Sequence, residues 1–77
     1  MKRKFKAKIT YTTDKNHPDT DKEVRLDYED AYIIDDRCFN GNDDIMEYIK
    51  EDMALVAGGG YNTSHIHDVK FEIREVN

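Results

Sequence analysis

The chain has 77 residues with a formal net charge of −5, and apolar and charged residues each make up 38% of it. A chain of this length forms one domain with a thin core, so we expect a single domain over residues 1–77, for which a homodimer would be one way to bury more area. Its one cysteine excludes an intramolecular disulfide. No apolar run is long enough to span a membrane and the first residues lack the apolar segment of a signal peptide, so we expect a cytoplasmic protein without a membrane partner.

The first predicted element is a half-buried strand over residues 4–11. Its apolar face comprises Phe5, Ala7, Ile9 and Tyr11, and its polar face comprises Lys4, Lys6, Lys8 and Thr10. This strict alternation is typical of a strand with one buried face. Residues 12–22 follow with many turn formers and the only proline of the chain, which predicts a long hairpin loop.

The second predicted strand covers residues 23–34. Apolar and charged residues alternate up to Tyr28, and an apolar run resumes at residues 31–34 after two acidic residues. The residues expected to face inward in its first part are Val24, Leu26 and Tyr28. We interpret the change of pattern as a bulge or bend within one strand. A short separate strand from Ala31 is the alternative.

Residues 42–60 carry the signals of an amphipathic helix. Asn42, Asp43 and Asp44 are each good N-cap residues, and carboxylates are favourable at the positive end of the helix dipole. At about 100° per residue, one face of the helix collects most of the apolar side chains. These are Ile45, Met46, Ile49, Met53, Val56 and Ala57. We expect Gly58 to end the helix in the left-handed conformation.

Asp52 breaks this pattern, because it projects into the apolar arc of the helix. A buried carboxylate needs hydrogen bonds or a cation. We expect Asp52 to lie at the rim of the core and to reach water or a tyrosine hydroxyl. The alternative is a functional carboxylate in a groove beside the helix, which makes Asp52 a candidate site residue.

The last predicted strand lies within residues 65–76, with Val69, Phe71 and Ile73 facing inward. The element order is therefore strand, strand, helix, strand. A right-handed helical connection makes the second and third strands parallel, and the first strand, antiparallel to its hairpin partner, fits between them. The predicted fold class is α+β: a ββαβ domain with a three-stranded mixed sheet in the order 2-1-3 and the helix on one face.

The lysines of the first strand fall in the middle of this predicted sheet. Acidic residues of both neighbouring strands are expected beside them on the same face: Glu23, Asp27, Glu29, Asp68 and Glu72. Opposite charges across a sheet stabilise it mildly. We therefore interpret the lysine row as a neutralised charge ladder and do not expect nucleic acid as a partner.

Charge is distributed unevenly along the chain. Residues 1–13 hold five cationic and no anionic side chains, whereas residues 14–36 hold nine anionic and three cationic ones. Such an excess of acid raises self-repulsion without helping the fold, so we interpret it as a surface for a protein partner with a basic surface. The candidate residues of this acidic surface are Asp19, Asp21, Glu23, Asp27, Glu29, Asp30, Asp35 and Asp36. Solubility alone would explain the same acids.

Motifs for metal binding or catalysis are weak. Residues 36–47 resemble a calcium-binding EF-hand loop at five positions, but Cys38 replaces an oxygen ligand, and an Asn-Gly turn before a capped helix explains the same residues. His65 and His67 share one side of a strand but lack two further zinc ligands. Cys38 has an acidic neighbourhood and no adjacent base. We expect no metal, no cofactor and no enzymatic activity.

The sequence best fits a small acidic binding protein that acts by occupying a surface of its partner. In size, acidity and lack of catalytic residues, it is similar to small phage-encoded inhibitors of host defence or nucleic-acid enzymes. That similarity implies a partner with a basic groove. A nucleic-acid-binding module that uses the lysine row is the first alternative, and an accessory subunit of an unknown process is the second.

Overall fold

The alternating first strand forms the centre of the structure. In the computed structural model, which describes residues 1–60 and 63–76, strand β1 (Lys2–Thr13) lies between β2 (Arg25–Asp35) and β3 (Ile66–Val76) in one sheet. Both neighbours run antiparallel to β1, so β2 and β3 are parallel to one another without being paired. The predicted order 2-1-3 and the predicted strand directions are confirmed. The description of the sheet as mixed was wrong, because the two parallel strands are not neighbours and every hydrogen-bonded pair in the described sheet is antiparallel.

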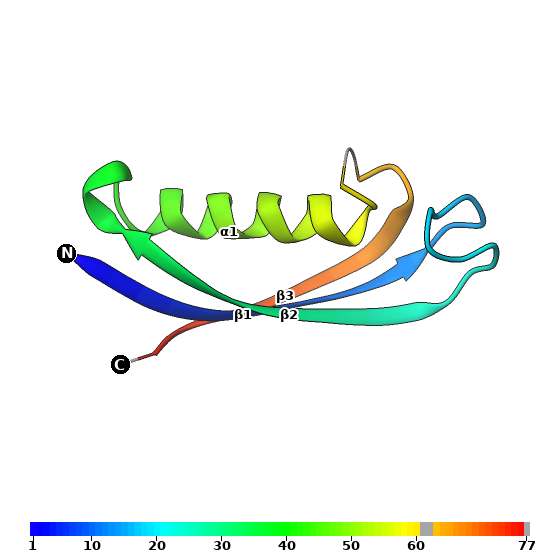
Figure 1. Cartoon of the computed structure of the whole chain (residues 1–77), viewed down its shortest axis with the longest axis horizontal. Helices are drawn as coiled ribbons and strands as arrows, with labels where there is room; N and C mark the ends of the chain where they lie inside the picture. Colours follow the sequence, from blue (N-terminus) through cyan, green and yellow to red (C-terminus); the bar gives the residue numbers. More distant parts are fainter. Residues whose placement is uncertain (61–62, 77) are drawn as a thin grey trace.

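One helix covers one face of this sheet (Figure 1). A short 3-10 helix, η1 (Asp36–Cys38), leads from β2 towards helix α1 (Asn42–Ala57), and α1 leads back to β3. The α+β class and the ββαβ order are therefore as predicted. The opposite face of the sheet carries no further element of the described chain (Figure 1).

The core lies between α1 and the sheet. It consists of the predicted face of β1 together with residues of all the other long elements: Phe5, Ala7, Ile9, Tyr11, Tyr32, Ile34, Ile45, Ile49, Met53, Ala57 and Ile66. Val56, which was predicted on the buried stripe of the helix, is 47% exposed. This part of the prediction was wrong, because the buried positions advance four residues at a time along α1, and at the C-terminal end of the helix Val56 points about 100° away from buried Ala57.

β2 contains no bulge, and this part of the prediction was wrong. Its register with β1 is regular over the whole strand. Asp30 pairs with buried Ala7, so it faces the helix, in phase with Tyr28 and Tyr32. The alternation therefore never changes phase, and the apolar run arises because Ile33, which is 71% exposed, stands on the open face. The irregular pairing of the sheet lies between β1 and β3, where Asp68 has a positive φ of 57°.

The first turn of α1 differs from the prediction at its cap. The N-cap residue is Gly41, not Asn42, Asp43 or Asp44. Its φ of 112° is one that residues with a Cβ rarely adopt, which is why glycine stands there. The carboxylate of Asp44 instead accepts a hydrogen bond from the backbone N–H of Asn40 at 3.0 Å.

The helix ends in a Schellman motif one residue later than predicted. Gly58 has a φ of −81°, and the left-handed position is taken by Gly59 with a φ of 98°. The N–H of Gly60 donates to the carbonyl of Leu55 at 2.7 Å, and the N–H of Gly59 donates to that of Val56 at 3.2 Å. These two bonds satisfy carbonyls that lack partners within the helix.

The loop between β1 and β2 packs against this end of α1. His17 is only 4% exposed, and its Nε2 lies 2.6 Å from the carbonyl oxygen of Ala57. The next residue, Pro18, lies so close to Gly59 that a Cβ there would be 2.5 Å from the proline Cγ. No pattern in the sequence predicted this contact between a loop and a helix end.

Candidate protein-interaction site

β2 is an uncovered edge of the sheet, because it pairs with β1 and with no other described strand. Its eleven residues carry four carboxylates and a single cation, Arg25. An edge strand presents backbone N–H and C=O groups that have no strand partner, and these groups can pair with an added strand. The edge of β2 is therefore acidic and available for pairing.

Asp27 and Glu29 flank this edge on the open face of the sheet. Their carboxylates lie 3.7 Å and 3.9 Å from the Nζ of Lys8, and the two side chains are 61% and 72% exposed. Ion pairs with this exposure contribute little to stability. A partner can therefore reach both carboxylates without a loss of fold stability.

Asp30 flanks the same edge on the helix-covered face. It accepts a hydrogen bond from the hydroxyl of Tyr28 at 2.9 Å and another from the N–H of Ala31 at 2.8 Å. The hydrogen bond to Asp30 raises the pKa of Tyr28. Because a strand is approached along its edge, Asp30 on one face and Asp27 and Glu29 on the other would all border one added segment.

Asp52 of α1 contacts β2 through Tyr32. The hydroxyl of Tyr32 donates to Oδ2 of Asp52 at 2.7 Å, and burial of the ring together with this bond strongly raises the pKa of Tyr32. Tyr48 packs edge-on against Tyr32, with 6.5 Å between ring centroids. The predicted tyrosine partner is confirmed, and it explains how a carboxylate is tolerated in the apolar arc. A functional role for Asp52 stays a prediction.

Exposed apolar side chains accompany the acidic edge on the helix side. Leu26, Tyr48, Leu55 and Val56 are between 39% and 47% exposed. Helical spacing places the three helix residues on the same side of α1 as Asp52. Aromatic and aliphatic side chains beside a few polar groups are typical of the centre of a protein interface. We call this set the β2 edge site: Leu26, Asp27, Tyr28, Glu29, Asp30, Tyr48, Asp52, Leu55 and Val56.

The predicted acidic residues that precede β2 do not join the β2 edge site. Asp19 and Asp21 are exposed in the loop that packs on the end of α1. Glu23 lies 3.3 Å from Nε2 of His67, whose Nδ1 lies 2.7 Å from a carboxylate oxygen of Asp14. This loop lies at the far end of the sheet from the start of α1 (Figure 1).

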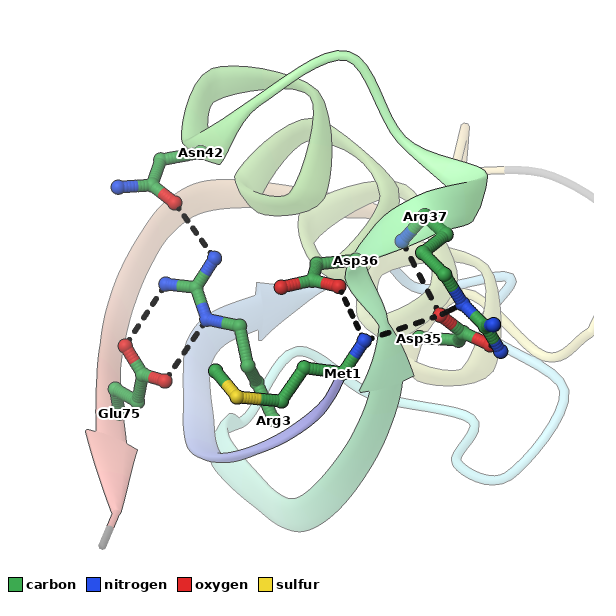
Figure 2. A network of polar contacts seen from close by, with 7 residues as sticks. All are labelled: Met1, Arg3, Asp35, Asp36, Arg37, Asn42 and Glu75. Carbon is green, nitrogen blue, oxygen red and sulfur yellow. Dashed lines mark hydrogen bonds and ion pairs between the residues drawn. The ribbon is translucent and has the colours of Figure 1, made fainter.

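Asp35 and Asp36 belong to a polar network at the opposite end (Figure 2). The side chain of Arg37 donates to both oxygens of Asp35 at 3.0 Å and 2.8 Å, and these bonds lower the pKa of Asp35 to about 2. The amine of Met1 donates to Asp36 at 2.9 Å. Both carboxylates thus have partners within the chain, and the structure divides the predicted acidic surface into three separate groups.

Arg3 connects three elements at the same end of the molecule (Figure 2). Its Nε and Nη2 donate to the two carboxylate oxygens of Glu75 at 2.9 Å and 2.8 Å, and its Nη1 donates to Oδ1 of Asn42 at 2.8 Å. The bidentate bond lowers the pKa of Glu75. Arg3 thereby joins β1 to the end of β3 and to the first turn of α1, a role that the sequence pattern did not reveal.

The lysine row is neutralised at one position only. Lys8 is paired across the sheet with Glu29 on β2 and Glu72 on β3, as a charge ladder requires. Lys6 instead lies between Ala31 and Arg74, and Lys4 lies between two aliphatic residues. The predicted ladder is therefore wrong for two of its three lysines, because the regular register of β2 places its acids beside Lys8.

Sequence reasoning missed the pairing of Tyr28 with Asp30 and the exposed apolar side of the helix. One signal for Asp30 was present in the sequence. Counted in steps of two from Val24, Asp30 falls on the same face as Tyr28 and Tyr32, which is where the structure places it. No comparable signal marked Leu55 and Val56 as exposed, since exposure depends on how far the sheet reaches under the helix.

The EF-hand-like segment and the single cysteine are the remaining motifs of the sequence. In the EF-hand-like segment, Asp36 and Asp44 bond to Met1 and to the backbone of Asn40, and Cys38 is an exposed free thiol. Within the described ranges, no group of three or more His, Cys, Asp or Glu side chains could hold a metal ion, and none of the helices there has the length and apolar character to cross a membrane.

Compared with known proteins, the chain matches no family model, no curated protein and no solved structure.

Proposed function

We propose that the protein binds a partner protein with a basic surface and acts by occupying that surface. The observation that carries the proposal is the β2 edge site: an uncovered strand edge with carboxylates on both faces, beside half-exposed tyrosine, leucine and valine side chains. The proposal involves no chemical step. Partner binding alone would account for the function.

Two kinds of contact would act together at this site. The backbone groups of β2 that have no strand partner can pair with an extended segment of the partner, which provides affinity without sequence selection. The N–H of Ala31 would exchange its bond to Asp30 for one to that segment. Selection would come from the side chains, because Asp27, Glu29 and Asp30 favour lysine or arginine on either face of the added segment. Tyr48, Leu55 and Val56 would then contact apolar side chains of the partner and exclude water.

The basic surface of the partner could be the nucleic-acid groove of an enzyme or a defence complex. Carboxylates spaced along a strand can occupy positions that phosphates take in such a groove, and they also accelerate association by electrostatic steering. This mode of action is that of a phage-type inhibitor. Nucleic-acid enzymes and defence complexes are therefore the partners to test first.

The test is affinity capture of the partner from the native host followed by measurement of association rates. The triple variant Asp27→Lys, Glu29→Lys, Asp30→Lys should remain folded by circular dichroism and associate with the partner at least about tenfold more slowly than the wild type. A control triple variant, Asp43→Lys, Glu47→Lys, Glu51→Lys, changes the charge by the same amount on the exposed side of α1. It should keep a rate much closer to that of the wild type.

Two results would contradict the proposal. If the edge variant is folded and associates at the wild-type rate, β2 is only solvated and the contact lies elsewhere. If both triple variants lose binding to the same degree, net charge is what matters, and the β2 edge site has no special role.

A further inference from the structure

The sheet face opposite α1 carries cations that have no acidic partner in the part of the chain that the structure describes. Lys4 and Lys6 are successive residues of β1 on this face, and Arg74 of β3 lies directly opposite Lys6. None of the three forms an ion pair with a carboxylate of residues 1–60 and 63–76. We call Lys4, Lys6 and Arg74 the basic cluster.

The sheet also separates charge between the two sides of the molecule. The strand residues on the face away from α1 hold seven cationic and five anionic side chains, a net charge of +2, with Asp68 counted because its carboxylate lies 4.0 Å from Arg25 of this face. All other positions of the chain hold five cationic and twelve anionic side chains, a net charge of −7. An acidic protein thus presents one basic face, and local charge, more than net charge, determines what approaches that face.

A shallow groove of about 730 Å³ crosses the middle of this face. Its lining includes three cations, Lys6, Lys8 and Arg74, and three carboxylates, Glu29, Asp30 and Glu72, and no residue of α1 takes part in it. Lysines two residues apart on a strand repeat about every 6.7 Å, which is twice the ~3.4 Å axial spacing of phosphates along one strand of a DNA duplex. The groove itself is balanced in charge, and it is the spacing of Lys4 and Lys6 along β1, with Arg74 beside Lys6, that suits an elongated polyanion.

We propose that this open face binds the phosphate backbone of nucleic acid without sequence preference. The strand positions of the face hold no phenylalanine, tyrosine or tryptophan on which a base could stack, and their one imidazole, His67, lies within 3.3 Å of the carboxylates of Asp14 and Glu23. They also hold only two large aliphatic residues, Ile33 and Val76, which is too little apolar area for the core of a stable protein interface. The basic cluster would bind the phosphates by electrostatic attraction. Glu29 and Glu72, which flank Lys8, border the cluster on one side.

The inference goes beyond the proposed function and uses different residues. The β2 edge site holds none of the basic cluster, so either proposal can fail while the other stands. If both hold, the protein would bind a protein partner along one edge and a nucleic acid on its open face.

The test is fluorescence anisotropy with a labelled DNA duplex of about 20 base pairs, at salt concentrations from about 20 to 200 mM. The wild-type protein should bind at the lowest salt, and the logarithm of its association constant should fall with a slope of about −2 to −3 against the logarithm of salt, as three phosphate contacts predict. The variant Lys4→Gln, Lys6→Gln, Arg74→Gln should bind at least about tenfold more weakly.

A matched control removes the same charge from other surfaces. The variant Lys15→Gln, Lys22→Gln, Lys50→Gln should bind within about twofold of the wild type. The inference is overturned if the wild type does not bind at the lowest salt, or if both variants weaken binding equally. It is also overturned if sedimentation shows that the wild type dimerises and that the basic-cluster variant is monomeric, since the face would then be covered by a second copy.

Discussion

Both ring nitrogens of the buried His17 hold the β1–β2 loop against α1. Nδ1 accepts the N–H of Asp19 at 3.1 Å, so the ring proton lies on Nε2, which donates to the carbonyl of Ala57 at 2.6 Å. The ring also stacks on Tyr11, with 6.4 Å between centroids. The carbonyl of Ala57 lies in the last turn of the helix, where backbone acceptors lack partners within the helix. His17 therefore satisfies an acceptor that the docked loop would otherwise bury.

Substitution of His17 should be costly for a loop residue. His17→Ala leaves the Ala57 carbonyl and the Asp19 N–H without their partner and opens a cavity, so the free energy of unfolding should fall by about 2–4 kcal/mol. His65→Ala, at a more exposed histidine outside the core, should change it by less than about 0.5 kcal/mol. Urea unfolding of both variants measures the difference. Equal effects would show that the loop does not depend on His17.

Among the elements, α1 has one buried side and one side with exposed apolar residues. Ile45, Ile49, Met53 and Ala57 are buried at successive turns against the sheet. Tyr48, Leu55 and Val56 are half-exposed and remain accessible. One helix thus contributes both to the core and to the β2 edge site.

Paired substitutions would separate these two sides. Ile49 is fully buried, so Ile49→Ala should lower the free energy of unfolding by about 2–5 kcal/mol through lost burial and a cavity. Val56→Ala should cost less than about 1 kcal/mol, because its side chain is already half in water. Both values follow from urea melts. A large loss for Val56→Ala would place this residue in the core and remove it from the interaction site.

At the scale of the whole molecule, different contacts close the two ends of an elongated domain. The principal extents are 43 × 21 × 16 Å. At one end, the loop between β1 and β2 packs on the C-terminus of α1 through His17. At the other end, Arg3 joins β1 to β3 and to the start of α1, and Arg37 bonds to Asp35 at the end of β2 (Figure 2). Between them lie the β2 edge site and the basic cluster, on different surfaces of the sheet.

The ion-paired carboxylates Asp35 and Glu75 should make the free energy of unfolding depend on pH. The pKa of Asp35 is lowered from 3.8 to about 2 by Arg37, and that of Glu75 is lowered by Arg3. Carboxyl groups with a lower pKa in the folded chain stabilise it above their ordinary pKa, and this contribution is lost as the pH falls through the folded value. The variant Arg3→Gln, Arg37→Gln should therefore lose stability less steeply than the wild type between about pH 5 and pH 2.

Urea midpoints at several pH values in that range would measure this dependence. The variant Lys15→Gln, Lys22→Gln has the same net charge as the double arginine variant but leaves the network intact, so its pH profile should be parallel to that of the wild type. Parallel profiles for all three proteins would mean that Asp35 and Glu75 titrate alike in the folded and unfolded chains. The network would then not contribute to the acid sensitivity.

The elements of this protein and their order can be read from its sequence alone. Strict alternation in residues 4–11 identified the central strand and its buried face, and the helical spacing around Ile49 identified the covering helix. The crossover rule then placed β1 between β2 and β3. These inferences succeeded because they depend on local periodicity and on chain connectivity, both of which can be read along the chain.

Only the tertiary structure decided which charges meet. The register of β2 pairs its acids with Lys8 and leaves Lys4 and Lys6 free, and it brings Asp30 to the helix side next to Tyr28. A shift of one residue would exchange the two faces of the strand, and an alternating charge pattern does not specify that shift. The docking of His17 on Ala57 and the bond from Arg3 to Glu75 likewise join positions 40 and 72 residues apart. Contacts of this separation follow from the packing of completed elements, so local patterns in the sequence do not encode them.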